Sequence, residues 1–435
     1  MAGSRPIFIF LASFSLGVIQ EGVGAETLAL QSGNIFPVSG GVVEHGTILI
    51  EDGKIKGIGR EVVVPPGARV IDVTGKYVIP GLIDSLSRLF IREGEAEESG
   101  AMSPELSILD TIDPFVKESE EVAAQGVTAV YVTPGGGVLG GCGAVLRLNG
   151  AKTVKEMTLK TNVAVKGAVG LSRDSQSSSL GRLADFASIR EALIETQTYL
   201  REKRRYEQDL ADYEKKKVET KEQKKDEDPQ KAKKDVPTRP TKYKTNPTYE
   251  VLAKVLGKEI PLQIEAHRVD DILNALRLAD EFGFRLILDR CTEGYKIADE
   301  IARRNVPVIA GPISRSFVGA PTLEYRDHDL RNAAILSTKG VKVALGVGGR
   351  DGAGSKFAGL VAAMAVGGGL DEGLALRAVT LTPAEILGVA DRIGSLDVGK
   401  DADVVVLSGR PFEALSQVEM VLIEGKVVYE RKVPK

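Results

Sequence analysis

The residues best suited to catalysis are few and lie far apart in the sequence. The chain has only three histidines among its 435 residues: His45, His267 and His328. A hydrolase that builds a two-metal site from imidazole groups uses about four histidines at the site alone. The low histidine count is therefore the observation on which the functional argument depends.

The middle of the chain must position any such site, and there short apolar strands alternate with helical stretches. Strands are predicted at 127–132, 164–169, 262–265, 285–288, 307–309 and 342–345. Helical stretches at 270–282, 294–304 and 330–338 lie between several of them. Repeated units of this size predict a parallel (β/α)8 barrel over residues 81–389, with its reaction site at the C-terminal ends of the strands.

Both ends of the chain show the sequence pattern of short β-strands separated by turns. Asp52-Gly53 lies between two alternating runs and predicts a tight hairpin, and Glu424-Gly425-Lys426 predicts a similar turn. Residues 26–80 and 390–435 are therefore expected to form one composite β-sandwich domain. The expected fold class is α/β, a TIM-like barrel joined to this small β domain.

Residues 1–25 have the form of a secretory signal peptide. Arg5 precedes an apolar run over 7–19, and Val23-Gly24-Ala25 offers a cleavage site of small residues. The alternative is a retained membrane anchor, but the run of about 13 residues is short for a bilayer. We expect a secreted or periplasmic protein that is free of the membrane after signal removal. Cys142 and Cys291 are too few for a disulfide framework, so buried thiols or a single disulfide are expected.

The charged residues balance overall but gather in one segment. With 57 basic and 60 acidic residues the formal charge is -3, and no basic patch with interleaved aromatics indicates nucleic acid. Residues 189–246 are predicted to be a charged helix and a disordered linker inserted into the barrel. A solvated face is the usual meaning of such a segment, and a partner-binding arm is the alternative. The glycines of 135–137 and 140–143 lack a following Lys-Ser/Thr, so they predict tight turns above the barrel and no phosphate loop.

Two specific segments resemble the entry and exit of the barrel in the amidohydrolase superfamily. The entry is 70–84, VIDVTGKYVIPGLID, and the exit is 380–388, TLTPAEILG, followed by 393–396 and 399–403. Ala266-His267-Arg268 and residues 292–298 further resemble the imidazolonepropionase-like branch. The resemblance covers nearly the whole mature chain except the charged insertion. It implies a hydrolase of C–N bonds other than peptide bonds, or of small cyclic amides or dipeptides, with one or two divalent metals, usually zinc.

The positions that hold the metals in this family carry other residues here. The resemblance places them at Leu86, Arg88, Glu265, Arg290 and Gly348. Leucine and glycine offer no side-chain donor, and arginine is a permanent cation that repels a metal. Glu265 alone could bind zinc. We therefore expect no metal cofactor and predict a catalytically inactive member, a pseudoenzyme that acts as a binding or partner scaffold.

The predicted pocket collects the polar residues near the strand ends: Arg88, Lys166, Glu265, His267, Asp289, Arg290 and Asp351. We expect Arg88 and Arg290 to neutralise Asp84, Glu265 and Asp289 in place of the metals. Lys166 falls where some relatives carry a carboxylated lysine, and without metals we expect an ordinary amine paired with Glu265.

Several alternatives for the pocket remain open. His267 is either a hydrogen-bonded structural residue or a base, and Asp351 could be recruited to the site by a register shift. The cations favour a small anionic ligand such as a carboxylate. The partner could also be a second copy of the chain or an active relative. The competing functions are an active hydrolase with an altered or single-metal site, and an interaction protein that works through the charged segment.

Overall fold

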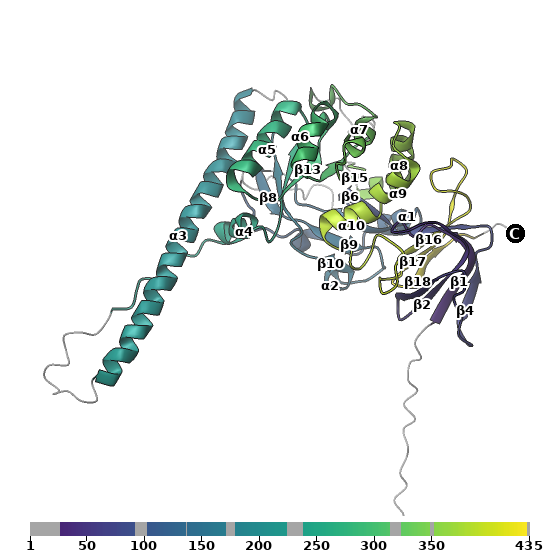
Figure 1. Cartoon of the computed structure of the whole chain (residues 1–435), viewed down its shortest axis with the longest axis horizontal. Coiled ribbons are helices and arrows are strands. Elements are labelled where there is room, and N and C mark those ends of the chain that lie inside the picture. The colour runs from purple at the N-terminus through teal and green to yellow at the C-terminus, as the bar shows by residue number, and fades with distance from the viewer. Residues whose placement is uncertain are drawn as a thin grey trace, which may run out of the picture.

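The computed structural model describes residues 27–91, 102–135, 137–170, 179–223, 238–313, 323–348 and 352–432. The expected signal segment and Asp351 lie outside these residues. The protein has a mixed α/β fold, with a β domain at one end, an α/β middle, and one long helix that projects from the other end (Figure 1).

Strands from both ends of the chain form a single eight-stranded sheet. Its order is β18 (Lys426–Glu430), β17 (Val418–Ile423), β16 (Val404–Leu407), β5 (Tyr77–Pro80), β1 (Thr27–Ile35), β2 (Val43–Glu51) and β3 (Lys54–Gly59), and β4 (Arg69–Asp72) pairs with β1. The N- and C-terminal parts meet where β5 pairs antiparallel with β16. The purple and yellow segments therefore lie side by side in Figure 1.

Both predicted tight turns are present in this sheet. Asp52 and Gly53 have positive φ values of 51° and 75°, and they join β2 to β3 with Glu51 opposite Lys54. Glu424 and Gly425 have φ values of 50° and 74° and join β17 to β18. Two successive positive φ angles match the right-handed twist of the flanking strands, which explains why glycine follows an acidic residue in each turn.

The strands of the middle form two hydrogen-bonded sheets among the described residues. One has the order β10 (Thr158–Lys160), β9 (Ala144–Arg147), β7 (Val127–Val132) and β6 (Leu82–Ser87). The other has the order β15 (Val343–Leu345), β14 (Val308–Ala310), β13 (Leu286–Arg290), β12 (Leu262–Ala266), β11 (Val165–Ala168) and β8 (Leu139–Cys142). The run from β11 to β15 is parallel throughout, as the alternation of strands and helices predicts.

The prediction that the second glycine run forms a turn was wrong. Gly140, Gly141 and Cys142 belong to β8, which pairs antiparallel with β11. A Cβ atom on Gly141 would lie 2.2 Å from the carbonyl oxygen of Leu106, and one on Gly143 would lie 2.6 Å from the hydroxyl of Tyr131. These glycines therefore permit a close approach of neighbouring chain segments inside a strand, which is the other common use of glycine in sheets.

Helices cover the strands of the middle (Figure 1). The α-helices are α1 (Glu118–Ala123), α2 (Val154–Met157), α4 (Pro247–Leu256), α5 (Val269–Phe282), α6 (Ala298–Arg303), α7 (Asn332–Thr338), α8 (Ala358–Gly367), α9 (Glu372–Ala378) and α10 (Leu381–Leu387). Short 3-10 turns are η1 (Ile108–Thr111), η2 (Gly294–Ile297), η4 (Leu323–Tyr325) and η5 (Gly352–Phe357). α5 illustrates their origin: apolar residues at 272, 275, 276 and 278 are buried on one face, and acidic residues in its first turn complement the helix dipole.

The projecting helix α3 (Ser179–Gln223) is 45 residues long and begins ten residues before the helix expected from the sequence. Its first half packs against α4 and α5 through buried residues that include Phe186, Ile189, Leu193 and Tyr199. From Arg201 to Val218 every described side chain is exposed or only half-buried. The stem of α3 is therefore part of the core, and the rest of it projects (Figure 1). No helix of the described residues combines the length and apolar character needed to cross a membrane.

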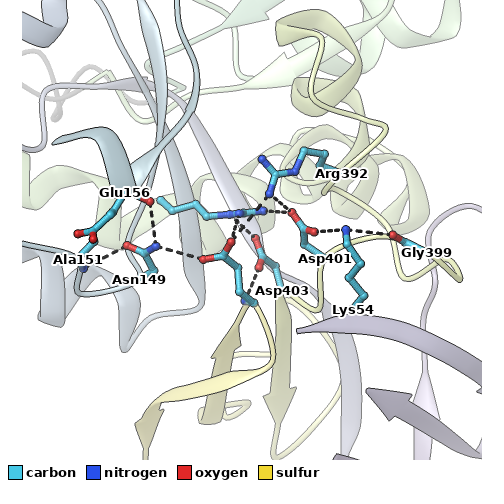
Figure 2. A network of polar contacts seen from close by, with 10 residues as sticks. Lys54, Asn149, Ala151, Glu156, Arg392, Gly399, Asp401 and Asp403 are labelled. Carbon is cyan, nitrogen blue, oxygen red and sulfur yellow. Dashed lines mark hydrogen bonds and ion pairs between the residues drawn. The ribbon is translucent and has the colours of Figure 1, made fainter. Parts of the chain in front are cut away.

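A buried ion network joins the middle to the β domain (Figure 2). Arg147, at the end of β9, is 3% exposed and contacts Asp401, Asp403 (3.6 Å) and Glu424 (2.5 Å). Asp401 also pairs with Arg392 and with Lys54, each at 2.7 Å. We call Arg147, Asp401, Asp403 and Glu424 the Arg147 cluster. Burial raises the pKa of Asp403 to about 6, although Arg147 opposes the shift.

Candidate functional site

Charged side chains converge where the parallel strands end. Lys166 from β11 places its Nζ 3.0 Å from Oε2 of Glu265 on β12 and within contact of Oδ2 of Asp289 on β13. Asp289 is fully buried. The three residues lie on neighbouring strands: Glu265 is in register with Asp289, and Lys166 lies beside Gln263, two residues before the level of Glu265. The expected pairing of Lys166 with Glu265 is therefore present, and Asp289 completes it.

Arg290 is the second cation of this group. Its Nε lies 3.5 Å from Oε1 of Glu265, and its Nη1 donates to the carbonyl oxygen of Gly348 at 3.2 Å. Arg290 and Cys291 have positive φ values of 65° and 46°, an uncommon backbone for non-glycine residues that concentrates at functional sites. We call Lys166, Glu265, Asp289 and Arg290 the strand-end cluster.

The electrostatics of the cluster follow from two cations facing two carboxylates. Burial alone would raise the pKa of Glu265, but Lys166 and Arg290 hold that pKa well below its usual range. Burial likewise opposes the charge on Lys166, yet Asp289 and Glu265 raise its pKa. The cluster is therefore a set of ion pairs at neutral pH, with Lys166 as an ammonium ion.

Gly348 and Leu86 show how the volume near the cluster is filled. A Cβ atom on Gly348 would lie 2.0 Å from Nη1 of Arg290, so the guanidinium occupies the space that a side chain at 348 would need. Leu86 packs so closely on Gly346 that a Cβ atom there would lie 2.5 Å from Cγ of Leu86. Two positions at which the family resemblance places metal ligands are thus filled by an apolar side chain and by the neighbouring arginine.

His267 lies beside the cluster and is fully buried. Its Nδ1 is 2.7 Å from the hydroxyl of Thr292, its Nε2 is 3.4 Å from Oε1 of Glu265, and its ring packs edge-on against Tyr325 at 4.6 Å between centroids. Both ring nitrogens of His267 therefore have a hydrogen-bond partner, as expected for a structural histidine. The same contacts also arrange a hydroxyl, an imidazole and a carboxylate in series, as in nucleophilic catalysis.

Asp84, on β6, has protein partners on both carboxylate oxygens. Oδ1 accepts hydrogen bonds from the backbone amides of Leu86 and Val347 at 3.0 Å each, and Oδ2 accepts one from Ser355 at 2.7 Å. Burial raises its pKa despite these bonds. Arg290 interacts with it only electrostatically, so the expected salt bridge from an arginine to Asp84 is not formed.

Arg88 and Asp351 do not join the cluster. Arg88 follows the end of β6 and is half-buried, and it forms no hydrogen bond or ion pair with the residues that the structure describes. The expectation of two arginines neutralising the carboxylates therefore holds for Arg290 and was wrong for Arg88. Asp351 lies outside the described residues. A small cavity of about 20 Å³ opens beside Arg290, lined in part by Thr292, Gly311 and Asn332.

Three polar residues of the site were missed from the sequence. Nε2 of Gln263 donates to Oδ2 of Asp289 at 2.8 Å, and its Oε1 accepts from the hydroxyl of Tyr131 at 2.8 Å. Gln263 lies two residues before Glu265 on β12, so strand alternation places both on one face and could have revealed it. Tyr131 similarly alternates along β7. Tyr325 has no such signal, because it reaches His267 from a short turn far along the chain.

The donor chemistry of this site does not match a divalent metal. In the described part of the chain no three His, Cys, Asp or Glu side chains are grouped in a way that could hold one. Both oxygens of Glu265 and one of Asp289 already face the ammonium or guanidinium group. A metal ion would have to displace these cations before it could bind.

Comparison with known proteins gives the family. The model of the amidohydrolase family matches residues 267–428. The crystal structure of an amidohydrolase from Thermotoga maritima is 31% identical, covers 93% of this chain and 100% of its own, and has a TM-score of 0.77.

Curated relatives match over short segments. An imidazolonepropionase from Thermoplasma acidophilum is 40% identical over 62 residues, 13% of this chain and 15% of its own length. A dihydroorotase from Trichlorobacter lovleyi is 39% identical over 57 residues, 13% of each chain. This chain thus matches less than a sixth of the length of either relative. The identity and full coverage of the Thermotoga structure show that the chain belongs to the amidohydrolase family.

Proposed function

We propose that this protein uses the amidohydrolase fold as a non-catalytic scaffold that binds a ligand or partner at the strand ends and does not hydrolyse C–N bonds there. One observation carries the proposal: the ammonium group of Lys166 lies between Glu265 and Asp289. These carboxylates are thereby neutralised by a protein cation, which takes the electrostatic role that a divalent metal has in metal-dependent hydrolases.

The arrangement of the strands is part of the same proposal. We infer that the two sheets of the middle are parts of one (β/α)8 barrel. The segment 139–147 supports this, because its first part pairs with β11 and its second part with β7. At the opposite junction the amide of Gly348 donates to the carbonyl of Leu86, and Ser85 donates to the carbonyl of Leu345. The β domain would be a sandwich, since apolar residues of β1, β2, β16 and β17 share one core.

A small anion is the ligand class that we propose to bind beside the strand-end cluster. Lys166 and Arg290 already face carboxylates, so neither offers a free charge. Arg88 does, because it is half-buried without a partner among the described residues, and a planar guanidinium suits a carboxylate or phosphate. We also propose that the protein forms oligomers, with a second copy of the chain or with an active relative. Export directed by the N-terminal segment is a further part of the proposal.

Metal content of the purified protein tests the central claim. After incubation with zinc, manganese and iron and then desalting, we expect less than about a tenth of an equivalent, because sites of this class hold metal tightly when they exist. One or two equivalents, lost in Glu265→Ala, would overturn the proposal.

A matched pair of lysine variants sharpens the test. Lys166→Ala removes the cation between the carboxylates, so we expect it to bind more zinc than the wild type does. Lys160→Ala is the control, because among the described residues Nζ of Lys160 hydrogen-bonds to the carbonyl oxygens of Leu387 and Gly388 and to no carboxylate. Equal zinc binding in both variants would mean that Lys166 does not exclude the metal.

A hydrolase with an altered site is the second candidate, and the contacts of His267 favour it. Glu265, His267 and Thr292 form a series of carboxylate, imidazole and hydroxyl. This candidate predicts turnover of small amides or esters in the presence of a chelator, lost in both His267→Asn and Thr292→Val. No turnover above that of the His267→Asn variant would remove it.

A further inference from the structure

The first turn of α3 carries a buried arginine, at the end of the helix opposite its projecting part. Arg182 is 8% exposed, although arginine is rarely buried without charged partners. It forms ion pairs with Asp271 in the first turn of α5 and with Glu324 in η4. These partners lie 89 and 142 residues away in the sequence, so Arg182 ties three separate parts of the chain together.

Arg182 attaches η4 to the stem of α3 through its ion pair with Glu324. Glu324 is 5% exposed, and its Oε1 accepts from Arg182. Its other oxygen, Oε2, is buried and has no hydrogen-bond partner in the structure. A buried carboxylate depends strongly on the cation that pairs with it, since removing one partner leaves an uncompensated charge. The position of η4 therefore depends on Arg182.

The residue after Glu324 covers the strand-end cluster. Tyr325 is 7% exposed, and its ring packs against His267, whose Nε2 faces Glu265. Leu323–Tyr325 thus forms a cover segment over the side of the cluster that carries His267. The path from helix α3 to the cluster runs through Arg182, Glu324, Tyr325 and His267, with direct contact at each step.

We propose that Arg182 is a tether that couples the projecting helix to the cover segment, so that a movement of the helix changes access to the strand-end cluster. As regulation of the ligand site, this inference rests on the proposed function. The coupling itself is a property of the fold and can be measured without a ligand.

The shape of α3 suits it to transmit such a movement. A helix of 45 residues is about 68 Å long, and its stem is held while its outer half projects (Figure 1). A second ion pair, Arg190 with Glu281, joins the same two helices between two and three turns farther along. The hydrogen bonds and ion pair of Arg190 in the described part of the chain go to Glu281 and not to η4, so a change at Arg190 tests attachment of α3 to α5 separately from attachment to the cover segment.

Hydrogen exchange read by mass spectrometry tests the tether in the full-length protein. In Arg182→Met and Glu324→Gln we expect about tenfold faster exchange in the segment 323–333, which holds the amide of His328 bonded to the carbonyl of Tyr325. Arg190→Met is the matched control and should leave this segment at the wild-type rate. Wild-type exchange in both Arg182→Met and Glu324→Gln would overturn the proposal.

Two further comparisons keep the test decisive. If Arg182→Met destabilises the whole protein, exchange will also rise in β16. In that case Glu324→Gln decides the outcome, because it retains the ion pair of Arg182 with Asp271. Leu193→Ala removes a buried side chain from the stem of α3. Added to the wild-type background it should speed exchange of 323–333, whereas added to Glu324→Gln it should cause no further increase. An equal effect in both backgrounds would show that the coupling bypasses the tether. Metal content and turnover stay independent of these readings, so a failure here is distinct from failure of the proposed function.

Discussion

At the strand ends two cations face two buried carboxylates, whereas at the boundary with the β domain one buried arginine faces three. The strand-end cluster is balanced, and its cations hold the pKa of Glu265 well below its usual range against the effect of burial. The Arg147 cluster has an excess of acid, and burial raises the pKa of Asp403 to about 6. The pKa shifts of Asp403 and Glu265 thus have opposite signs, because burial outweighs the effect of Arg147 at Asp403, whereas Lys166 and Arg290 together outweigh burial at Glu265.

The two clusters also differ in how they can respond to damage. Asp401 has Lys54 and Arg392 as further partners, and Glu424 is 38% exposed, so both keep some compensation without Arg147. Asp289 is fully buried and pairs with Lys166, and Glu265, which is nearly buried, would keep only the longer pair with Arg290 at 3.5 Å among the described cations. The balanced cluster should therefore be the more fragile one when a cation is removed.

The largest effect is expected for Lys166→Met. This change leaves Glu265 and Asp289 without their shared cation, and we expect the free energy of unfolding to fall by about 3–5 kcal/mol in urea titrations near pH 7. Adding Asp289→Asn should recover part of the loss, because it removes one of the stranded charges. A loss below about 1 kcal/mol, the scale of one ordinary hydrogen bond, would show that the ion pairs do not stabilise this region.

Arg147→Met should cost less, about 3 kcal/mol near pH 7, because only Asp403 loses its one cationic partner. The loss should shrink toward pH 5, where Asp403 takes up a proton and no longer needs a cation. Urea titrations at the two pH values check this. A loss that is equal at both, or larger than that of Lys166→Met, would break the contrast between the clusters.

The pH dependence of stability gives a smaller effect of predictable sign. The pKa of Asp403 is about 6 in the folded protein against an ordinary value of 3.8, so the folded state binds this proton more tightly. The stabilisation from this group is therefore present at low pH and is lost as pH rises through about 6. Between pH 4.5 and 6.5 the wild type should lose about 1–2 kcal/mol more than Asp403→Asn.

Glu265 should behave in the opposite way. Because its pKa is lowered, its contribution is present above its ordinary value of 4.5 and is lost as pH falls through the depressed folded value. Asp403→Asn should thus change the curve between pH 4.5 and 6.5, and Glu265→Gln only its acid end. Parallel curves for the wild type and Asp403→Asn would contradict the assignment.

The parts of the fold that were predictable are those with a local cause. Val127–Val132 is a strand with the predicted bounds, because a run of β-branched residues without breakers has few alternatives. The segment Leu139–Cys142 was missed, since its glycines resemble a loop until the neighbours that require them, Leu106 and Tyr131, are known. Close approach is a property of two segments, and one segment alone does not reveal it.

The same division applies to the site. Pairing of Lys166 with Glu265 was predictable, because parallel strands bring their C-terminal ends together. That Arg88 has no partner among the described residues was not predictable, because Asp84, its expected partner, accepts hydrogen bonds from the backbone amides of Leu86 and Val347. Nor was the role of Gly348, whose missing side chain leaves room for a guanidinium from another strand.

The smallest effect tests whether burial, and not the number of charges, distinguishes the two clusters from the rest of the chain. Lys215, Lys216 and Lys217 are exposed on the outer half of α3. Replacing all three with glutamine removes more charge than either cluster variant, yet we expect the free energy of unfolding to change by at most about 0.5 kcal/mol. Urea titrations of this triple variant beside Lys166→Met make the comparison direct. A loss of more than 1 kcal/mol in the free energy of unfolding would mean that the outer half of α3 has contacts that stabilise the protein. The contrast between buried and exposed charge would then no longer explain the ranking of these variants.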